Sequence, residues 1–206
     1  MNKNIFKNTA ILTVITLAAG ILLGIVYEIT KDPIQRTREQ AKQEAYKVVM
    51  KEASEFEEYK EFDEKEAEKA LKESGITGCY VNGASVARNK DGEEIGYVIS
   101  TTSKEGYGGE IQISVGILSD GTVSGIEILS ISETAGLGME ADEPEFKRQF
   151  KNVITEKFEV KKDNPAGNVD ALSGATITTR AVTNAVNAGI SYYHNVLAGG
   201  NVDGEV

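Results

Sequence analysis

An uncharged apolar stretch near the start of the chain predicts a membrane-spanning helix. Residues 8–27 are twenty consecutive positions without a charge, most of them Ala, Ile, Leu, Val, Gly or Thr. At about 1.5 Å per residue, a helix of this length spans about 30 Å, the thickness of the hydrocarbon core of a bilayer. A cleaved signal peptide is the alternative, but its apolar core is usually shorter and a small-residue cleavage site should follow it. We therefore expect residues 1–31 to form an uncleaved N-terminal membrane anchor.

The polar stretch that follows has a helical pattern of apolar positions. Pro33 marks a turn or a helix start, and residues 34–60 then favour a helix. The apolar positions near a spacing of 3.6 are Ala41, Ala45, Val48, Val49, Ala53 and Phe56. Residues 63–66 resemble a capping box, which predicts a second short helix that runs through Lys72. We interpret residues 32–75 as a helical spacer.

From residue 76 onward the pattern changes to that of β-strands. Two pairs of apolar-rich segments each flank an Asp-Gly dipeptide, which is a strong signal for a β-hairpin. The segments are residues 81–88, 94–102, 111–118 and 123–131, and the dipeptides are Asp91-Gly92 and Asp120-Gly121. The two hairpins predict a largely antiparallel sheet.

Helical patterns and turn residues complete the predicted domain. We expect a short helix at residues 143–150, a short strand at residues 158–160 and a last helix at residues 178–196. Gly199 and Gly200 end that helix, and residues 201–206 form a frayed tail. The predicted fold class is therefore α+β: an N-terminal transmembrane helix, then a largely antiparallel sheet with flanking helices over residues 76–200.

Charge and composition exclude several functions. The net charge is −10, to which residues 1–31 contribute +2, so the remainder carries −12. Such an acidic domain repels nucleic-acid phosphates, and we expect no nucleic-acid partner. The single Cys79 excludes an intramolecular disulfide, and the single His194 has no matched set of carboxylates near it, so we expect no metal site. No pattern of catalytic residues suggests hydrolysis.

Residues 170–179, which we call the threonine segment, carry the clearest candidate chemistry. Their sequence is Asp-Ala-Leu-Ser-Gly-Ala-Thr-Ile-Thr-Thr. Small residues at 173–175 let a bulky group approach the backbone, and Thr176 then presents a hydroxyl just before a helix. A helix N-terminus offers free N–H donors and a positive dipole, which favour a phosphate, and Arg180 adds a charge one turn later. A threonine-rich helix cap without a ligand is the alternative.

The threonine segment resembles the recognition motif of flavin transferases, which move FMN from FAD onto a threonine. The matching residues are Asp170, Ser173, Gly174, Ala175 and Thr176. The resemblance implies that Thr176 carries FMN through a phosphoester bond, and that Asp170 and Ser173 present it to the transferase. The remaining residues that we expect at the cofactor are Ser173, Gly174, Ala175, Thr178 and Thr179. Of these, Thr178 and Thr179 are the other candidate acceptors.

A second segment, residues 133–138, is called here the glycine loop. Its sequence, Glu-Thr-Ala-Gly-Leu-Gly, is similar to the Glu-Thr-Pro-Gly-Leu-Gly loop of FMN-binding domains in the same family. Ala135 stands in place of the usual proline, and we expect it to loosen the turn without abolishing binding. The residues that we expect to contact the cofactor are Glu133, Thr134, Gly136, Leu137 and Gly138. An ordinary glycine turn is the alternative, which the presence of both motifs disfavours.

The anchor, the domain size and the two motifs together resemble the G subunit of the Rnf complex over nearly the whole chain. Rnf complexes move electrons between ferredoxin and NAD and couple this to Na⁺ or H⁺ transport. The resemblance implies an electron-carrying redox subunit with covalent FMN, no catalytic residues and no independent turnover. Its partners would be other Rnf subunits and a flavin transferase. The alternatives are the C subunit of the Na⁺-translocating NADH:quinone reductase, which is usually longer, and a stand-alone extracytoplasmic flavoprotein.

The side of the membrane on which the domain lies does not follow from charge counting. Lys3 and Lys7 precede the apolar stretch, whereas Lys31, Arg36 and Arg38 follow it, so the positive-inside count is close to a tie. In the family that the chain resembles, the domain faces away from the cytoplasm. We therefore expect a single-pass protein of the cell (inner) membrane with an extracytoplasmic domain.

Overall fold

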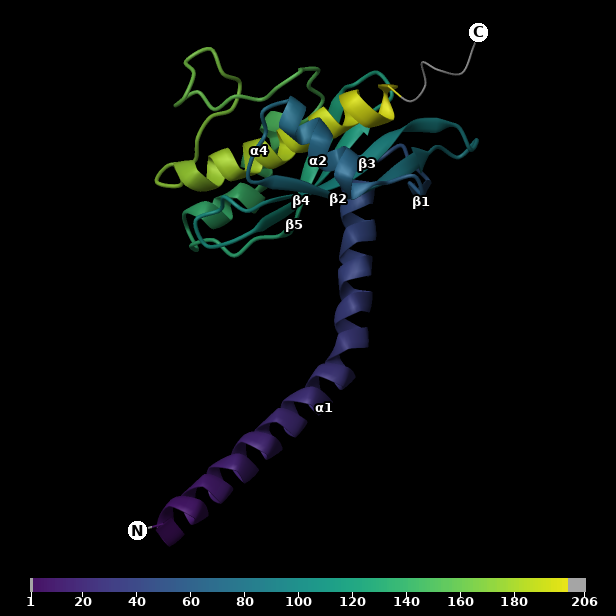
Figure 1. The fold of residues 1–206 in the computed structure, drawn as a ribbon. Helices are drawn as coiled ribbons and strands as arrows, with labels where there is room; N and C mark the ends of the chain where they lie inside the picture. Colours follow the sequence, from purple (N-terminus) through teal and green to yellow (C-terminus); the bar gives the residue numbers. More distant parts are fainter. Residues whose placement is uncertain (1, 200–206) are drawn as a thin grey trace. The chain divides into compact units, whose positions relative to one another are not determined.

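The computed structural model describes residues 2–199, so Gly200 and the expected tail at residues 201–206 lie outside the described part of the chain. The chain divides into two compact units, Met1–Ala41 and Lys42–Val206, with the boundary inside the expected spacer. The elements in chain order (Figure 1) are α1 Asn2–Val49, β1 Glu55–Glu58, α2 Glu64–Glu73, β2 Cys79–Arg88, β3 Glu94–Ser103, β4 Ile111–Leu118, β5 Val123–Ser130, η1 Gly138–Asp142, α3 Pro144–Lys147, η2 Arg148–Phe150, α4 Thr176–Tyr192 and η3 Tyr193–Leu197.

The helix α1 carries the predicted apolar span. Within residues 4–49 it is long and apolar enough to cross a membrane, and the side chains of its most apolar window are not buried by protein. Pro33 lies inside the helix, so the turn or helix start expected there is wrong. A proline has no N–H to donate to the carbonyl four residues earlier, here that of Ile29, yet the helix continues through it.

The predicted helix at residues 34–60 is also wrong in its second half. Helix α1 ends at Val49, and residues 55–58 instead form the edge strand β1, which pairs antiparallel with β2. The ring of Phe56 packs on Tyr46 with centroids 5.4 Å apart. Phe56 therefore packs from a strand and is half-buried, although its sequence spacing continues the apolar stripe of the helix.

The sheet confirms the predicted fold class. Its five strands are antiparallel and follow the order β1-β2-β3-β4-β5, so neighbours in sequence are neighbours in the sheet. Strands β2 and β3 form the first predicted hairpin, and β4 and β5 form the second. The short helix α2 is also confirmed, because the Asp63 carboxylate caps it by accepting the N–H groups of Lys65 and Glu66 at 2.8 and 2.9 Å.

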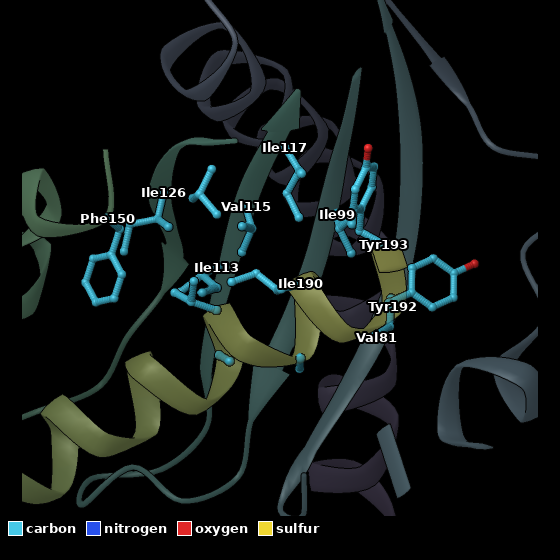
Figure 2. Packing of buried hydrophobic residues seen from close by; sticks show 14 of the residues in the cluster. Val81, Ile99, Ile113, Val115, Ile117, Ile126, Phe150, Ile190, Tyr192 and Tyr193 are labelled. Carbon is cyan, nitrogen blue, oxygen red and sulfur yellow. The ribbon is translucent and has the colours of Figure 1, made fainter. Parts of the chain in front are cut away.

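Helix α4 packs across one face of the sheet and forms the main core with it (Figure 2). The alternating β4 side chains of Ile113, Val115 and Ile117 point toward this helix, and Ile190 and Tyr193 meet them from α4 and the turn after it. Successive strand side chains point to opposite faces. The opposite face is covered by the end of α1, in a cluster made of Tyr46, Val49, Met50, Ala87 and Val98.

Two predictions in the C-terminal half need correction. Residues 158–160 do not form a strand. The side-chain amide of Asn187 accepts the Phe158 N–H at 2.8 Å and donates to the Phe158 carbonyl at 2.9 Å, so it takes the place of a strand neighbour. The last helix begins at Thr176 rather than at residue 178, and it ends at Tyr192 with one π turn after it. The helix expected at residues 143–150 is present as α3 followed by η2.

Candidate functional site

The glycine loop and the threonine segment line one cavity of about 550 Å³. Its walls are formed by Tyr107, Glu133, Thr134, Leu137, Gly138, Gly174, Ala175, Thr176, Ile177 and Thr178. The fold brings the two segments together because the glycine loop leaves the end of β5, while the threonine segment leads into α4, which crosses the same sheet. Seven of the sequence-predicted cofactor residues therefore line the same cavity as Thr176.

Thr176 lies at the N-terminus of α4 as the first helical residue. The preceding Ala175 is the N-cap residue and provides no side-chain cap. Among the described residues, no acceptor is bonded to the N–H groups of residues 176–178. The Thr176 hydroxyl is partly exposed and accepts a hydrogen bond from the Lys162 ammonium at 2.9 Å. The site thus combines uncapped N–H donors, a reachable hydroxyl and a cation.

Thr178 and Thr179 are less suited than Thr176 to accept a group from outside. Both are buried, with exposed fractions of 1% and 0%. The Thr179 hydroxyl accepts the Leu172 N–H at 3.1 Å and donates to the Ala175 carbonyl at 2.9 Å. Thr179 therefore holds the turn of the threonine segment in place.

The glycine loop is shaped by close packing at Gly138. A Cβ atom at this position would lie 2.7 Å from the Thr178 hydroxyl and 2.8 Å from the side chain of Glu133. Gly136 differs, because it has open space around it but a positive φ of 72°, which favours glycine. The Glu133 carboxylate also accepts the Gly108 N–H at 3.2 Å, which ties the loop to the turn before β4.

Three of the residues predicted to bind the cofactor or the transferase line a neighbouring cavity of about 810 Å³ and do not line the cavity that contains Thr176. They are Gly136, Asp170 and Ser173. The Asp170 carboxylate is exposed and pairs with Lys161 at 2.9 Å, while its backbone N–H donates to the Gln149 amide at 2.7 Å. Ser173 is exposed. The threonine segment therefore presents Asp170 and Ser173 to one side and Thr176 to the other.

Arg180 is not free to act as the counter-charge that the sequence suggested. Its guanidinium makes a two-pronged ion pair with Asp163, with Nε at 2.8 Å from one carboxylate oxygen. This hydrogen bonding lowers the pKa of the Asp163 carboxyl, and the charges of Arg180 and Lys162 add to the effect. The cation at Thr176 is Lys162, which the sequence analysis missed.

Tyr107 and Ile177 were also missed as residues of the site. Both line the cavity and both are exposed. Tyr107 sits between glycines in the run Gly106-Tyr107-Gly108-Gly109, and a Cβ atom at Gly108 would lie 2.0 Å from the Ser132 carbonyl oxygen. That glycine-rich run around one aromatic residue was the available signal. Lys162 had none, because it lies in a polar stretch beside another lysine.

Comparison with known proteins identifies the family. The model of the FMN-binding domain matches residues 106–191, and the model of the RnfG N-terminal region matches residues 1–49. The chain is 33% identical to the G subunit of the Na⁺-translocating ferredoxin:NAD⁺ oxidoreductase complex of Acetobacterium woodii, over 94% of each chain. The chain belongs to the family of Rnf complex G subunits. It is also 32% identical to the proton-translocating counterpart of Clostridium ljungdahlii, over 91% of each chain.

The two matched regions of this Rnf family member correspond to structural parts. The RnfG N-terminal region ends at residue 49, where α1 ends, and the FMN-binding domain contains both the glycine loop and the threonine segment. FMN is therefore the cofactor of this domain. Among solved structures, the chain is similar to the crystal structure of Shewanella oneidensis NqrC, with 22% identity, a TM-score of 0.45, and coverage of 54% of this chain and 57% of that one.

Proposed function

We propose that this chain is the membrane-anchored electron-carrying subunit of an ion-translocating ferredoxin:NAD⁺ oxidoreductase complex, with FMN attached covalently to Thr176. The observation that carries the proposal is the cavity that joins the Thr176 hydroxyl to the glycine loop. Its volume of about 550 Å³ lies in the range typical of cofactor sites. The other subunits of the complex are the electron-transfer partners in this proposal.

The residues at the phosphate end of the cavity fit FMN. A phosphoester on Thr176 would lie at the N-terminus of α4, where three N–H groups lack acceptors among the described residues. Such a position stabilises a phosphate through hydrogen bonds and the helix dipole. The Lys162 ammonium adds a full positive charge at the same oxygen.

The residues at the other end fit a flat, largely apolar ring. Among residues 50–199, four large apolar side chains are exposed, and three of them line this cavity. They are Tyr107, Leu137 and Ile177, with exposed fractions of 72%, 42% and 48%. An apolar patch of this kind marks a binding site, because a ligand that covers it removes apolar surface from water.

A covalent tether suits an electron carrier. FMN supplies reversible redox chemistry at its ring when bound, and a bond through the phosphate leaves that ring unmodified. In this proposal Tyr107, Leu137 and Ile177 would hold the ring, and the N-terminus of α4 would hold the phosphate. The described residues contain no group of His, Cys, Asp or Glu that could hold a metal ion. In this proposal the subunit orients the cofactor and does not turn over a substrate.

The intact mass of the protein from its native membrane tests the attachment. The mass should exceed that of the sequence by one FMN minus one water, with the added mass on the peptide that contains Thr176. Thr176→Val should remove the added mass and leave the thermal midpoint nearly unchanged, because the Thr176 side chain is only partly buried. Unmodified protein from cells with an active flavin transferase would contradict the proposal.

We propose that the flavin transferase recognises the side chain of Asp170. Its carboxylate is exposed and lies away from the cavity around Thr176, so Asp170→Ala should lower FMN attachment without unfolding the domain. Lys161→Ala is the matched control, because it removes the ion pair and keeps the carboxylate. Full attachment to the Asp170→Ala protein would exclude this role.

The proposed orientation places the domain outside the cytoplasm. A long domain can cross the membrane largely regardless of the charges that flank its anchor. Protease added outside spheroplasts or intact cells should therefore digest the chain beyond Lys31. Digestion only after lysis would place the domain in the cytoplasm and contradict this orientation.

A further inference from the structure

We propose that Lys162 is the positioning residue that selects Thr176 as the acceptor and then neutralises the phosphodiester formed there. This inference rests on the proposed attachment of FMN. The Lys162 ammonium donates a hydrogen bond to Thr176 Oγ1 at 2.9 Å, across fourteen positions of sequence. The interaction joins two segments that are held together independently of it.

Three consecutive side chains dock beside the threonine segment. Lys161 pairs with Asp170 at 2.9 Å, and Asp163 pairs with Arg180, so Lys162 lies between two ion pairs that link the same segments. Each neighbour of Lys162 is therefore already paired with an opposite charge. Within residues 2–199, no carboxylate oxygen lies within 4.0 Å of the Lys162 ammonium, so its charge remains available.

The backbone around Lys162 is also fixed. The Lys161 N–H donates to the Val169 carbonyl at 2.9 Å, and the Asp163 N–H donates to the Val160 carbonyl at 2.9 Å. Val160 and Val169 are buried, with exposed fractions of 5% and 0%. The turn that carries Lys162 is therefore anchored in the core, and from it the Lys162 side chain reaches Thr176 at the N-terminus of α4.

Lys162 explains why one hydroxyl of the segment is favoured over the others. Ser173 is exposed, but it faces the neighbouring cavity and has no cation bonded to it among the described residues. Thr178 and Thr179 are buried. Among the hydroxyls of the threonine segment, all of which are described, only that of Thr176 is both partly exposed and bonded to a lysine. Lys162 therefore adds selectivity that exposure alone does not provide.

The transfer step balances with Lys162 protonated throughout. A bond forms between Thr176 Oγ1 and the phosphorus of the FMN half of FAD, and the bond from that phosphorus to the bridging oxygen breaks. AMP leaves, and the hydroxyl proton goes to a base of the transferase, with no electron transfer. Because Lys162 donates to Oγ1, the hydroxyl keeps its own proton available to that base. The product carries one negative charge beside the Lys162 ammonium, and such a pair is a strong charge-assisted contact.

The test is a time course of FMN attachment in cells that co-express the full chain and a flavin transferase. Intact mass gives the modified fraction for the wild type, Lys162→Ala, Lys162→Arg and Lys161→Ala. Lys162→Ala should slow attachment about tenfold, the equivalent of about 1.4 kcal/mol. Lys162→Arg should restore most of the rate, and Lys161→Ala should stay close to the wild type.

A second readout separates positioning from folding. In the modified proteins, the phosphorus-31 resonance of the phosphodiester should shift in Lys162→Ala and not in Lys161→Ala, with equal thermal midpoints. An unchanged rate and resonance in Lys162→Ala would overturn this inference, as would equal slowing in both alanine variants. If the wild type itself acquires no FMN, the proposed attachment fails rather than the role of Lys162.

Discussion

The two segments that line the cavity are held in place by opposite means. The threonine segment is held by hydrogen bonds from side chains: the Thr179 hydroxyl bonds two backbone groups, and the Gln149 amide bonds the backbone of Asp170. The glycine loop depends instead on close packing. Because Gly138 has no side chain, the loop can approach Thr178 closely. The threonine segment should therefore be the more sensitive to the loss of a hydrogen bond at Thr179, and the glycine loop to added side-chain volume at Gly138.

The largest effect on folding should come from Gly138→Ala. The added methyl group would lie 2.7 Å from the Thr178 hydroxyl, so the free energy of unfolding should fall by about 2 to 3 kcal/mol. Gly125→Ala in β5 is the matched control, because a Cβ atom there meets nothing within 4 Å. Chemical denaturation of the detergent-solubilised chain measures both. Equal stability of the two variants would contradict the steric account of the glycine loop.

Thr179→Val should have the next largest effect. The substitution keeps the volume but leaves the Leu172 N–H without its acceptor, which costs about 1 to 2 kcal/mol. The control is Thr183→Val, since that hydroxyl only donates to the Thr179 carbonyl within α4, and we expect a loss of about 0.5 kcal/mol. If Thr183→Val proved as destabilising as Thr179→Val, the threonine segment would not depend on its hydrogen bonds.

Gly136→Ala tests the effect of the backbone conformation alone, because the added methyl group would meet no neighbouring atom. Its φ of 72° strains an alanine by about 1 kcal/mol, whereas the space around it is open. FMN should remain attached, because Thr176 lies on a different cavity from Gly136. We expect the flavin absorbance or redox potential to shift through the displaced Leu137. Unchanged spectra together with lower stability would assign the loop a folding role only.

The smallest effect on stability should come from Tyr107→Ala, within about 0.5 kcal/mol, because the side chain is 72% exposed. A tyrosine ring stacked on the flavin quenches its fluorescence, so flavin fluorescence should rise in this variant. Tyr107→Phe keeps a ring and should keep the quenching. Equal fluorescence of all three proteins would place the flavin away from Tyr107.

The parts of the fold that were predicted correctly depend on local signals. An Asp-Gly dipeptide sets each hairpin, and Asp63 caps α2 through its own neighbours in sequence. The errors depend on distant partners. Strand β1 forms because β2 offers it an edge, and Phe158 needs no strand neighbour because Asn187 bonds its backbone. Neither partner can be inferred from the spacing of apolar residues.

In the site, too, the correct predictions depend on local sequence signals and the errors on distant partners. The residues of the two motifs were predicted because each motif is contiguous, and the structure brings most of them to one cavity. Lys162 was missed because its role comes from a turn that docks fourteen positions away from Thr176. Arg180 was misassigned because its partner Asp163 comes from that same turn.

The burial of the last two turns of α1 determines where the protein can be cut. Tyr46, Val49 and Met50 belong to the core under the sheet, and the Tyr46 hydroxyl lies 3.3 Å from the Ser100 hydroxyl. A soluble fragment that begins at Lys42 keeps this cluster, whereas one that begins after Met50 exposes Val98 to water. Exposed apolar patches of this kind promote aggregation. A protease that releases a folded domain from the membrane must therefore cleave ahead of Ala45, within the helix itself.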